Sequence, residues 1–146
     1  MRRFFSLKVA AVAALASAAV VAACSSSSDN SCGSGTPPSL AGSWALRAFT
    51  LGATTITAPP ATGELRIHEA NATSGRYAIN YDLGVGGPQF DSGNYVLTGQ
   101  HCMSQSSLVN ANQPQFTGTY TLTNADSLAV TGSAGGQTVN NYWTIE

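Results

Sequence analysis

Apolar and polar residues alternate with a period of two in several short segments of this chain. Such alternation is typical of antiparallel strands with one buried and one solvated face. The clearest segment, residues 75–83, places four apolar residues on one face: Tyr77, Ile79, Tyr81 and Leu83. Turn-forming Gly, Pro, Asn and Asp residues separate the segments. The pattern predicts eight or nine strands, near residues 43–49, 52–57, 63–69, 75–83, 93–98, 101–109, 115–123, 127–132 and 138–145.

A short motif, Gly-x-Tyr-x-(Leu or Ile), occurs three times within this pattern. It begins at Gly75, Gly93 and Gly118. Glycine at the start of a strand permits a bend or bulge in a curved sheet. We therefore expect the tyrosine and the aliphatic residue of each copy to face one interior, with Tyr77, Tyr95 and Tyr120 in equivalent positions.

The first and last strands carry the two tryptophans. In the first, Trp44, Leu46 and Ala48 are expected on one face, and Ala45, Arg47 and Phe49 on the other. The last strand is expected to place four residues on one face: Val139, Asn141, Trp143 and Ile145. Many short sequential strands favour a meander that closes on itself, because closure removes exposed strand edges.

The motif Gly42-Ser43-Trp44 near the start of this region resembles the first-strand motif of the lipocalins and of small bacterial lipocalin-like lipoproteins. The resemblance covers residues 40–146 and implies an all-β, antiparallel up-and-down barrel of about eight strands, of the calycin type. The chain is shorter than a full lipocalin and shows no C-terminal helical pattern. These departures bear more on ligand binding than on the barrel.

The first 24 residues resemble a bacterial lipoprotein signal. Arg2, Arg3 and Lys8 precede an apolar run that ends in the lipobox-like sequence Val21-Ala22-Ala23-Cys24. The resemblance implies cleavage after residue 23, a diacylglycerol on Cys24 and a place in the cell envelope, with the outer membrane favoured because Ser25 is not Asp. The alternatives are an ordinary secretory signal or an uncleaved anchor, although 15 residues from Val9 to Ala23 fall short of the about 20 that a span requires.

Residues 24–39 are rich in Ser, Gly and Pro and are expected to form a flexible tether. Cys32 and Cys102 remain as an even pair in an exported chain. An intramolecular disulfide is therefore the default expectation, and two free thiols or an intermolecular bond are the alternatives. Such a bond would pin the middle of the tether to the barrel.

Charge argues against nucleic-acid binding. The chain has six basic and seven acidic residues, and three of the basic ones belong to the expected signal. The remainder carries three arginines and seven acidic residues, a net charge of −4. Three scattered arginines do not form the basic patch that neutralises phosphates.

The sequence also offers no recognisable catalytic arrangement, so we expect no enzymatic activity. A Gly-x-Ser-x-Gly motif is absent, and Glu64 and Glu69 would lie on opposite faces of one strand. His68, His101 and Cys102 lack a recognised ligand spacing, so neither a metal nor a cofactor is expected.

The remaining functional hypotheses therefore concern the expected interior of the barrel. Its residues either fill the barrel or line a site for one small ligand, and buried tyrosine and tryptophan favour some polar space inside. The first hypothesis is a barrel that binds a small hydrophobic molecule at the envelope. The alternative is a solid barrel that engages a protein partner, as protease-inhibitor-like barrels do. The candidate ligand-lining or core residues are Trp44, Leu46, Tyr77, Ile79, Tyr81, Tyr95, Leu97, Phe116, Tyr120, Leu122 and Trp143.

Overall fold

The computed structural model describes residues 30–84 and 86–146. The expected signal, Cys24 and the first part of the expected tether lie outside these residues. Within the described residues, no helix has the length and apolar character needed to cross a membrane. The elements are η1 (Asn30–Cys32), β1 (Gly42–Leu51), β2 (Thr54–Thr57), β3 (Thr62–Asn71), β4 (Ser74–Asp82), β5 (Gln89–Thr98), β6 (Cys102–Ser107), β7 (Phe116–Thr123), β8 (Ser127–Ala134) and β9 (Gln137–Ile145).

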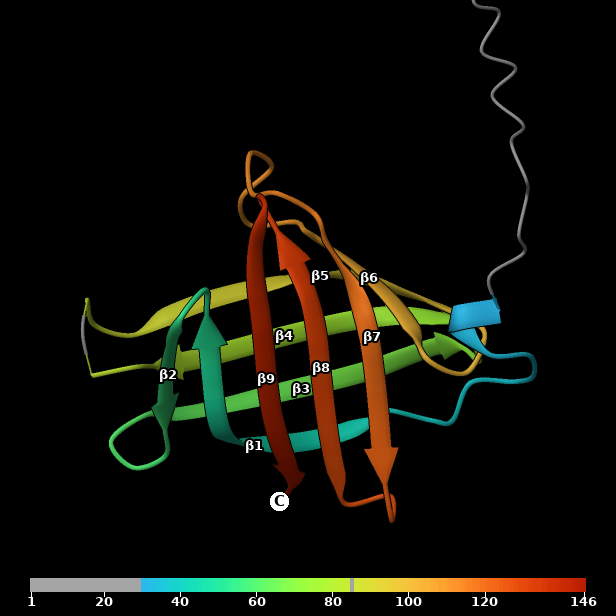
Figure 1. Cartoon of the computed structure of the whole chain (residues 1–146), viewed down its shortest axis with the longest axis horizontal. Coiled ribbons are helices and arrows are strands. Elements are labelled where there is room, and N and C mark those ends of the chain that lie inside the picture. Colours follow the sequence, from blue (N-terminus) through green and yellow to red (C-terminus); the bar gives the residue numbers. More distant parts are fainter. Residues whose placement is uncertain (1–29, 85) are drawn as a thin grey trace, which may run out of the picture.

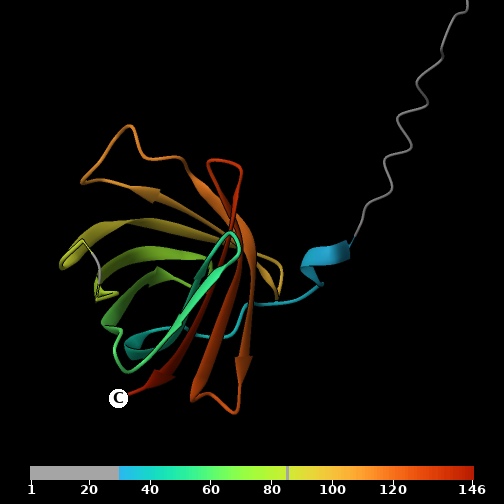
Figure 2. The same cartoon turned by 60° about the vertical axis from the view of Figure 1, so that its left-hand side comes forward.

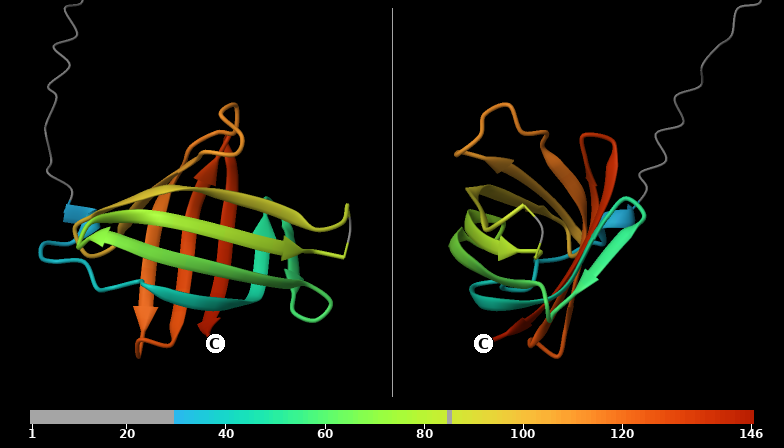
Figure 3. Two further views of the ribbon diagram at one scale, coloured as in Figure 1. Left: turned by 180° about the vertical axis from the view of Figure 1, so that it is seen from behind. Right: turned by 90° about the vertical axis from the view of Figure 1, so that its left-hand side faces the viewer.

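Eight of the nine strands form a closed antiparallel barrel (Figure 1). The strands pair in the order β1-β3-β4-β5-β6-β7-β8-β9, and β9 pairs back to β1. The extra strand, β2, pairs with the second half of β1, beyond the point where β3 leaves it. The left view of Figure 3 shows strands β3–β5 lying across strands β7–β9, and Figure 2 shows the two groups on opposite sides of the barrel. Strand β1 pairs with both β3 and β9 and so joins the two groups. The expected all-β barrel of about eight strands is confirmed.

Most strand boundaries differ from the expected ones by one or two residues, and the start of β5 differs by four. Strand β5 begins at Gln89, four residues before Gly93, and β6 ends at Ser107 rather than at residue 109. Leu108 and Val109 instead lie in the loop before β7, where both are exposed. Asp91, two residues before Gly93, is of a type that is depleted in strands, and the cross-strand pairing of residues 89–93 with β4 overrides this preference.

A β-bulge in β1 makes the expected facing of its second half wrong. The register of β1 against β9 shifts between Leu46 and Ala48. A bulge adds one residue to one strand, so every later side chain changes face. Phe49 consequently packs against the core, while Ala48 pairs with the exposed Tyr142.

Two copies of the Gly-x-Tyr motif pack against each other across neighbouring strands. Gly75 of β4 lies opposite Tyr95 of β5, and Tyr77 lies opposite Gly93. A Cβ atom at Gly75 would lie 2.7 Å from the Tyr95 hydroxyl oxygen, and one at Gly93 would lie 2.8 Å from Cε1 of Tyr77. Because each glycine lacks a side chain, the ring of the tyrosine opposite it lies directly against the glycine backbone.

The third copy of the motif is paired differently. Tyr120 lies opposite Val130, whereas Gly118 lies opposite Gly132 and close to the ring of Phe116. All three tyrosines are buried, but Tyr120 does not rest on a glycine of a neighbouring strand. All three tyrosines therefore face the interior as expected, and only Tyr77 and Tyr95 share the packing on a glycine of the neighbouring strand.

One end of the barrel is closed by packed side chains. Leu40 and Trp44 are both buried there, and the indole Nε1 of Trp44 donates a hydrogen bond to the Leu40 carbonyl at 3.1 Å. The backbone N–H of Leu40 donates to Oε1 of Glu69 at 2.7 Å. Leu40, in the segment before β1, is thus held across the barrel end through both its backbone N–H and its carbonyl group.

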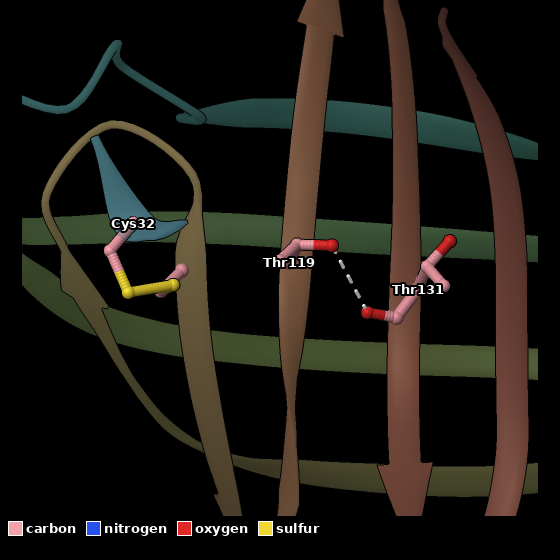
Figure 4. The surroundings of a disulfide bond; sticks show 4 residues. Cys32, Thr119 and Thr131 are labelled. Atoms are coloured by element: carbon pink, nitrogen blue, oxygen red, sulfur yellow. Dashed lines mark hydrogen bonds between the residues drawn. A yellow bond between two sulfur atoms is a disulfide. The ribbon is translucent and has the colours of Figure 1, made fainter. Parts of the chain in front are cut away.

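A disulfide between Cys32 and Cys102 fastens the N-terminal segment to this closed end (Figure 4). It joins η1 to the first residue of β6, and the His101 N–H donates to the Cys32 carbonyl at 2.9 Å. A Cβ at Gly99 would overlap the same carbonyl, so the turn between β5 and β6 fits closely against the segment. The expected disulfide is confirmed, and the expected tether has a fixed point at Cys32.

Candidate ligand-binding cavity

The opposite end of the barrel contains a cavity of about 230 Å³. It lies where β1, β4, β6 and β8 end and where β5, β7 and β9 begin. Its walls come from seven strands and from the loop before β7. The lining residues are Phe49, Leu51, Tyr77, Ile79, Tyr81, Asp91, Gln105, Gln113, Phe116, Ala134, Val139 and Asn141.

Aromatic rings form much of the cavity wall. Phe49 of β1 and Tyr81 of β4 stack with ring centroids 5.6 Å apart and planes inclined by 15°. Tyr77 and Phe116 complete the aromatic lining from β4 and β7. This arrangement depends on the bulge in β1, because without the extra residue Phe49 would face outward.

A carboxylate lies within this aromatic wall. Asp91 of β5 lies two residues before Gly93 and therefore shares the inward face of Gly93 and Tyr95. The Tyr77 hydroxyl donates to its Oδ2 at 2.7 Å, and the Ser107 hydroxyl donates to its Oδ1 at 2.5 Å. Asp91 thus joins β4, β5 and β6 through side-chain hydrogen bonds at the cavity.

Amide side chains add further polar atoms to the lining. The Oδ1 atom of Asn141 is buried and has no hydrogen-bond partner among the described residues. Gln105 lies across from Tyr95 and donates from Nε2 to the sulfur of Met103 at 3.4 Å. The cavity lining therefore combines apolar walls with polar side chains.

The structure divides the sequence-predicted interior residues into two groups. Four of them line the cavity: Tyr77, Ile79, Tyr81 and Phe116. Six are buried and do not line it, and Leu122 is partly buried against this core. These six residues are Trp44, Leu46, Tyr95, Leu97, Tyr120 and Trp143. The interior is therefore packed toward the closed end and hollow toward the other.

Sequence reasoning misses several lining residues. Simple alternation places Phe49 on the outer face, and Asp91 falls before the expected start of its strand. Continuing the alternation backward from Tyr95 through Gly93 reaches Asp91, so a signal for it is present in the sequence. Gln113 lies in the loop before β7, where period-2 alternation gives no information.

Larger depressions exist on the outside of the barrel. One of about 710 Å³ is lined by residues that include Arg66 and His68, which are exposed on the outer face of β3. Within residues 30–84 and 86–146, no three His, Cys, Asp or Glu side chains gather as a metal site would require. The site in the barrel end is therefore the stronger candidate, because concave, mostly apolar sites with a few polar groups are typical of ligand pockets.

No protein-family model matches the chain, and no curated protein matches it. Three solved structures are similar to it. The redesigned β-barrel b11L5F_LGL has a TM-score of 0.57 and 14% identity, over 73% of this chain and 91% of that one. The redesigned β-barrel mFAP0, bound to DFHBI, has a TM-score of 0.57 and 12% identity, over 72% and 97%. A de novo designed fluorescence-activating β-barrel has a TM-score of 0.52 and 13% identity, over 73% and 93%.

These similarities show the fold. The chain is a closed antiparallel β-barrel of eight strands with one additional strand. At 12–14% identity, these similarities do not identify the residues of a binding site in this chain.

Four tyrosines on the inner face have raised pKa values. Burial raises the pKa of Tyr95 to about 12, with smaller contributions from the charge of Glu69 and from Tyr120. Burial is also the main reason that the pKa values of Tyr77, Tyr81 and Tyr120 are raised. For Tyr77, the hydrogen bond to Asp91 and the charge of Asp91 raise the pKa further.

We expect the barrel to lose stability in alkaline solution for this reason. In the unfolded chain, tyrosine ionises with a pKa of about 10. Above that pH the unfolded state binds fewer protons than the folded state, so the free energy of unfolding falls as the pH rises from about 10 toward 12. Urea unfolding followed at several pH values between 8 and 12 measures this decline. A Tyr95→Phe variant should show a smaller decline, and constant stability of the wild type up to pH 12 would contradict the expectation.

Proposed function

We propose that this protein is an exported, lipid-anchored barrel that binds a small hydrophobic molecule at the cell envelope. The observation that carries the binding proposal is the cavity of about 230 Å³ at the open end of the barrel. The proposed activity is binding without catalysis. A lipocalin-like role is part of this proposal, on the resemblance of the Gly42-Ser43-Trp44 motif.

The size of the cavity favours a molecule of one or two rings. A cavity of about 150 Å³ accepts benzene, whereas sites for drug-sized ligands begin at about 300 Å³. Aromatic and aliphatic side chains would surround the apolar body, and Asp91 and Asn141 would orient its polar group. The similar barrel mFAP0, which is bound to DFHBI, supports the view that a barrel of this architecture holds a small molecule inside.

A cavity-filling substitution tests binding. Ala134 lines the cavity, and Ala134→Trp places a large ring inside it. Ala70 is exposed on β3, so Ala70→Trp is a matched control that adds the same ring outside the barrel. We expect the wild type and Ala70→Trp to bind the two-ring fluorescent probe 2-naphthol equally, and Ala134→Trp to bind it at least tenfold more weakly.

Urea unfolding of both variants controls for loss of the fold. If a folded Ala134→Trp variant binds 2-naphthol as tightly as the wild type does, the probe binds elsewhere and the cavity is not the binding site. Absence of binding by the wild type would overturn the proposed function for molecules of this size.

The proposed anchor rests on the sequence of residues 2–24. Two acyl chains on Cys24 would give stable attachment, because each buried methylene contributes about 0.8 kcal/mol and one chain alone binds only marginally. Metabolic labelling with palmitate in a bacterial host should mark the wild type but not Cys24→Ala. Equal labelling of both would remove the lipid from the proposal.

A second candidate is a protein partner at the open end. Four exposed apolar residues lie near the cavity mouth: Leu51, Phe90, Leu108 and Val109. Exposed apolar groups of this kind are a feature of interaction surfaces. If a protein binds there, the double substitution Leu108→Ser and Val109→Ser should abolish its binding and leave the binding of 2-naphthol unchanged.

A further inference from the structure

We infer that the cavity selects a small organic amine in its cationic form, with the ammonium group at Asp91 and the apolar body against the aromatic wall. This inference rests on the proposed function and assigns a ligand class to the same site. Its basis is the position of one carboxylate among aromatic rings, with no cationic side chain in the described cavity lining.

Asp91 has hydrogen-bonding capacity left after its protein contacts. An ionised carboxylate offers about four acceptor positions. Tyr77 and Ser107 occupy one on each oxygen. Asp91 lines the cavity and is only partly buried, so its remaining acceptor positions are open to a donor that enters the cavity.

No basic side chain of the described residues neutralises this carboxylate. The cavity lining contains no Arg, Lys or His. Arg47 donates from Nε to the Thr144 hydroxyl at 2.7 Å, and Arg66 pairs with Glu64. Arg76 is exposed, on the face of β4 opposite to that of Tyr77. Buried or partly buried charges are usually paired, and here a ligand cation would supply the missing charge.

The surrounding rings suit a cation with an apolar body. A cation within about 6 Å of an aromatic ring face is attracted by the ring quadrupole, and the attraction grows when water is removed. Phe49, Tyr77, Tyr81 and Phe116 line the same space as Asp91. An anionic ligand would instead meet the carboxylate as a like charge.

A second acceptor lies across the barrel from Asp91. In the closed ring of eight strands, β9 is four positions from β5 and therefore lies opposite to it. Asn141 of β9 lines the cavity, and its Oδ1 atom is buried without a hydrogen-bond partner among the described residues. An ammonium group has three donors, so it can bind more than one acceptor at the same time.

The competing explanation is that Asp91 has only a structural task. It holds Tyr77 and Ser107, and Ser107 in turn accepts hydrogen bonds from the N–H groups of Val109 and Asn110 at 3.2 and 3.0 Å. A purely structural carboxylate would affect stability and the loop but would not discriminate between charged and neutral ligands. Ligand preference therefore separates the two explanations.

The test compares 2-phenylethylamine with 2-phenylethanol, which has a hydroxyl in place of the ammonium group and the same number of non-hydrogen atoms. Binding of each to the wild-type protein is measured by calorimetric titration at pH 7. We expect the amine to bind at least about tenfold more tightly, the effect expected of one hydrogen bond to a charged group. The anion 3-phenylpropionate should bind more weakly than either.

Two variants test whether Asp91 causes the preference for the amine over the alcohol. Asp91→Asn removes the charge and retains a side-chain acceptor, and it should reduce the preference for the amine to about one. Asp82→Asn is the matched control, because Asp82 lies next to the inward-facing Tyr81 on β4 and its Oδ1 accepts from the Gly84 N–H at 2.8 Å, away from the cavity lining. It should retain the full preference.

Equal affinity of the wild type for the amine and the alcohol would overturn this inference and leave hydrophobic binding in the cavity intact. A preference that persists in a folded Asp91→Asn variant would also overturn it. If the wild type binds none of the three compounds and does not bind 2-naphthol, the proposed function fails together with the inference. The wild-type comparison needs no variant, so it decides the question even if Asp91→Asn does not fold.

Discussion

Replacing Tyr95 by alanine is expected to lower the free energy of unfolding by about 3–5 kcal/mol, the range for removal of a large buried aromatic side chain. Tyr95 is 2% exposed and its ring lies on the backbone of Gly75. The loss should be large because Gly75 has no side chain that can fill the space. Urea unfolding of the purified protein measures the change.

Two further tyrosine changes serve as controls. The Tyr95 hydroxyl is buried without a hydrogen-bond partner among the described residues, so Tyr95→Phe should be neutral or stabilising. Tyr142 is 43% exposed, and Tyr142→Ala should cost far less, near the about 0.5 kcal/mol range of surface changes. Similar costs for Tyr95→Ala and Tyr142→Ala would contradict the burial on which the packed half of the barrel depends.

Removing the disulfide is expected to lower the free energy of unfolding by about 4 kcal/mol. The bond joins residues 70 positions apart, and the chain-entropy model gives this figure for a loop of that length. The change is made with the double substitution Cys32→Ser and Cys102→Ser and is measured by urea unfolding. A reducing agent should destabilise the wild type by a similar amount and leave the double variant unchanged. Equal stability of oxidised and reduced wild type would show that the bond contributes nothing.

The strand pattern was predictable because alternation of apolar and polar residues directly reflects a sheet with one buried face. Each expected strand is present in the described structure, and Tyr77 and Tyr95 face inward as the repeated motif indicates. The closure of the sheet followed from the number of strands and from the need to remove edges. These features depend on local sequence and on short-range pairing.

The cavity was not predictable in the same way, because it depends on how two parts of the sheet meet. One additional residue near Arg47 turns Phe49 inward, and its trace in the sequence is a change of the large apolar residues from even positions (Trp44, Leu46) to an odd one (Phe49). Whether an interior is filled depends on the summed volumes of side chains from eight strands. Asp91 could be predicted from the sequence only by continuing the alternation backward from Tyr95 through Gly93, beyond the expected start of the strand.

The attachment of the chain at Cys32 sets the orientation of the barrel at a membrane if Cys24 carries the proposed lipid. Cys32 lies eight positions after Cys24, and an extended chain of that length spans at most about 28 Å. The disulfide lies at the closed end, opposite the cavity. The short link between Cys24 and Cys32 would therefore hold the closed end of the barrel close to the bilayer, with the cavity mouth facing the aqueous compartment. The ligand would then arrive from solution rather than from the lipid phase.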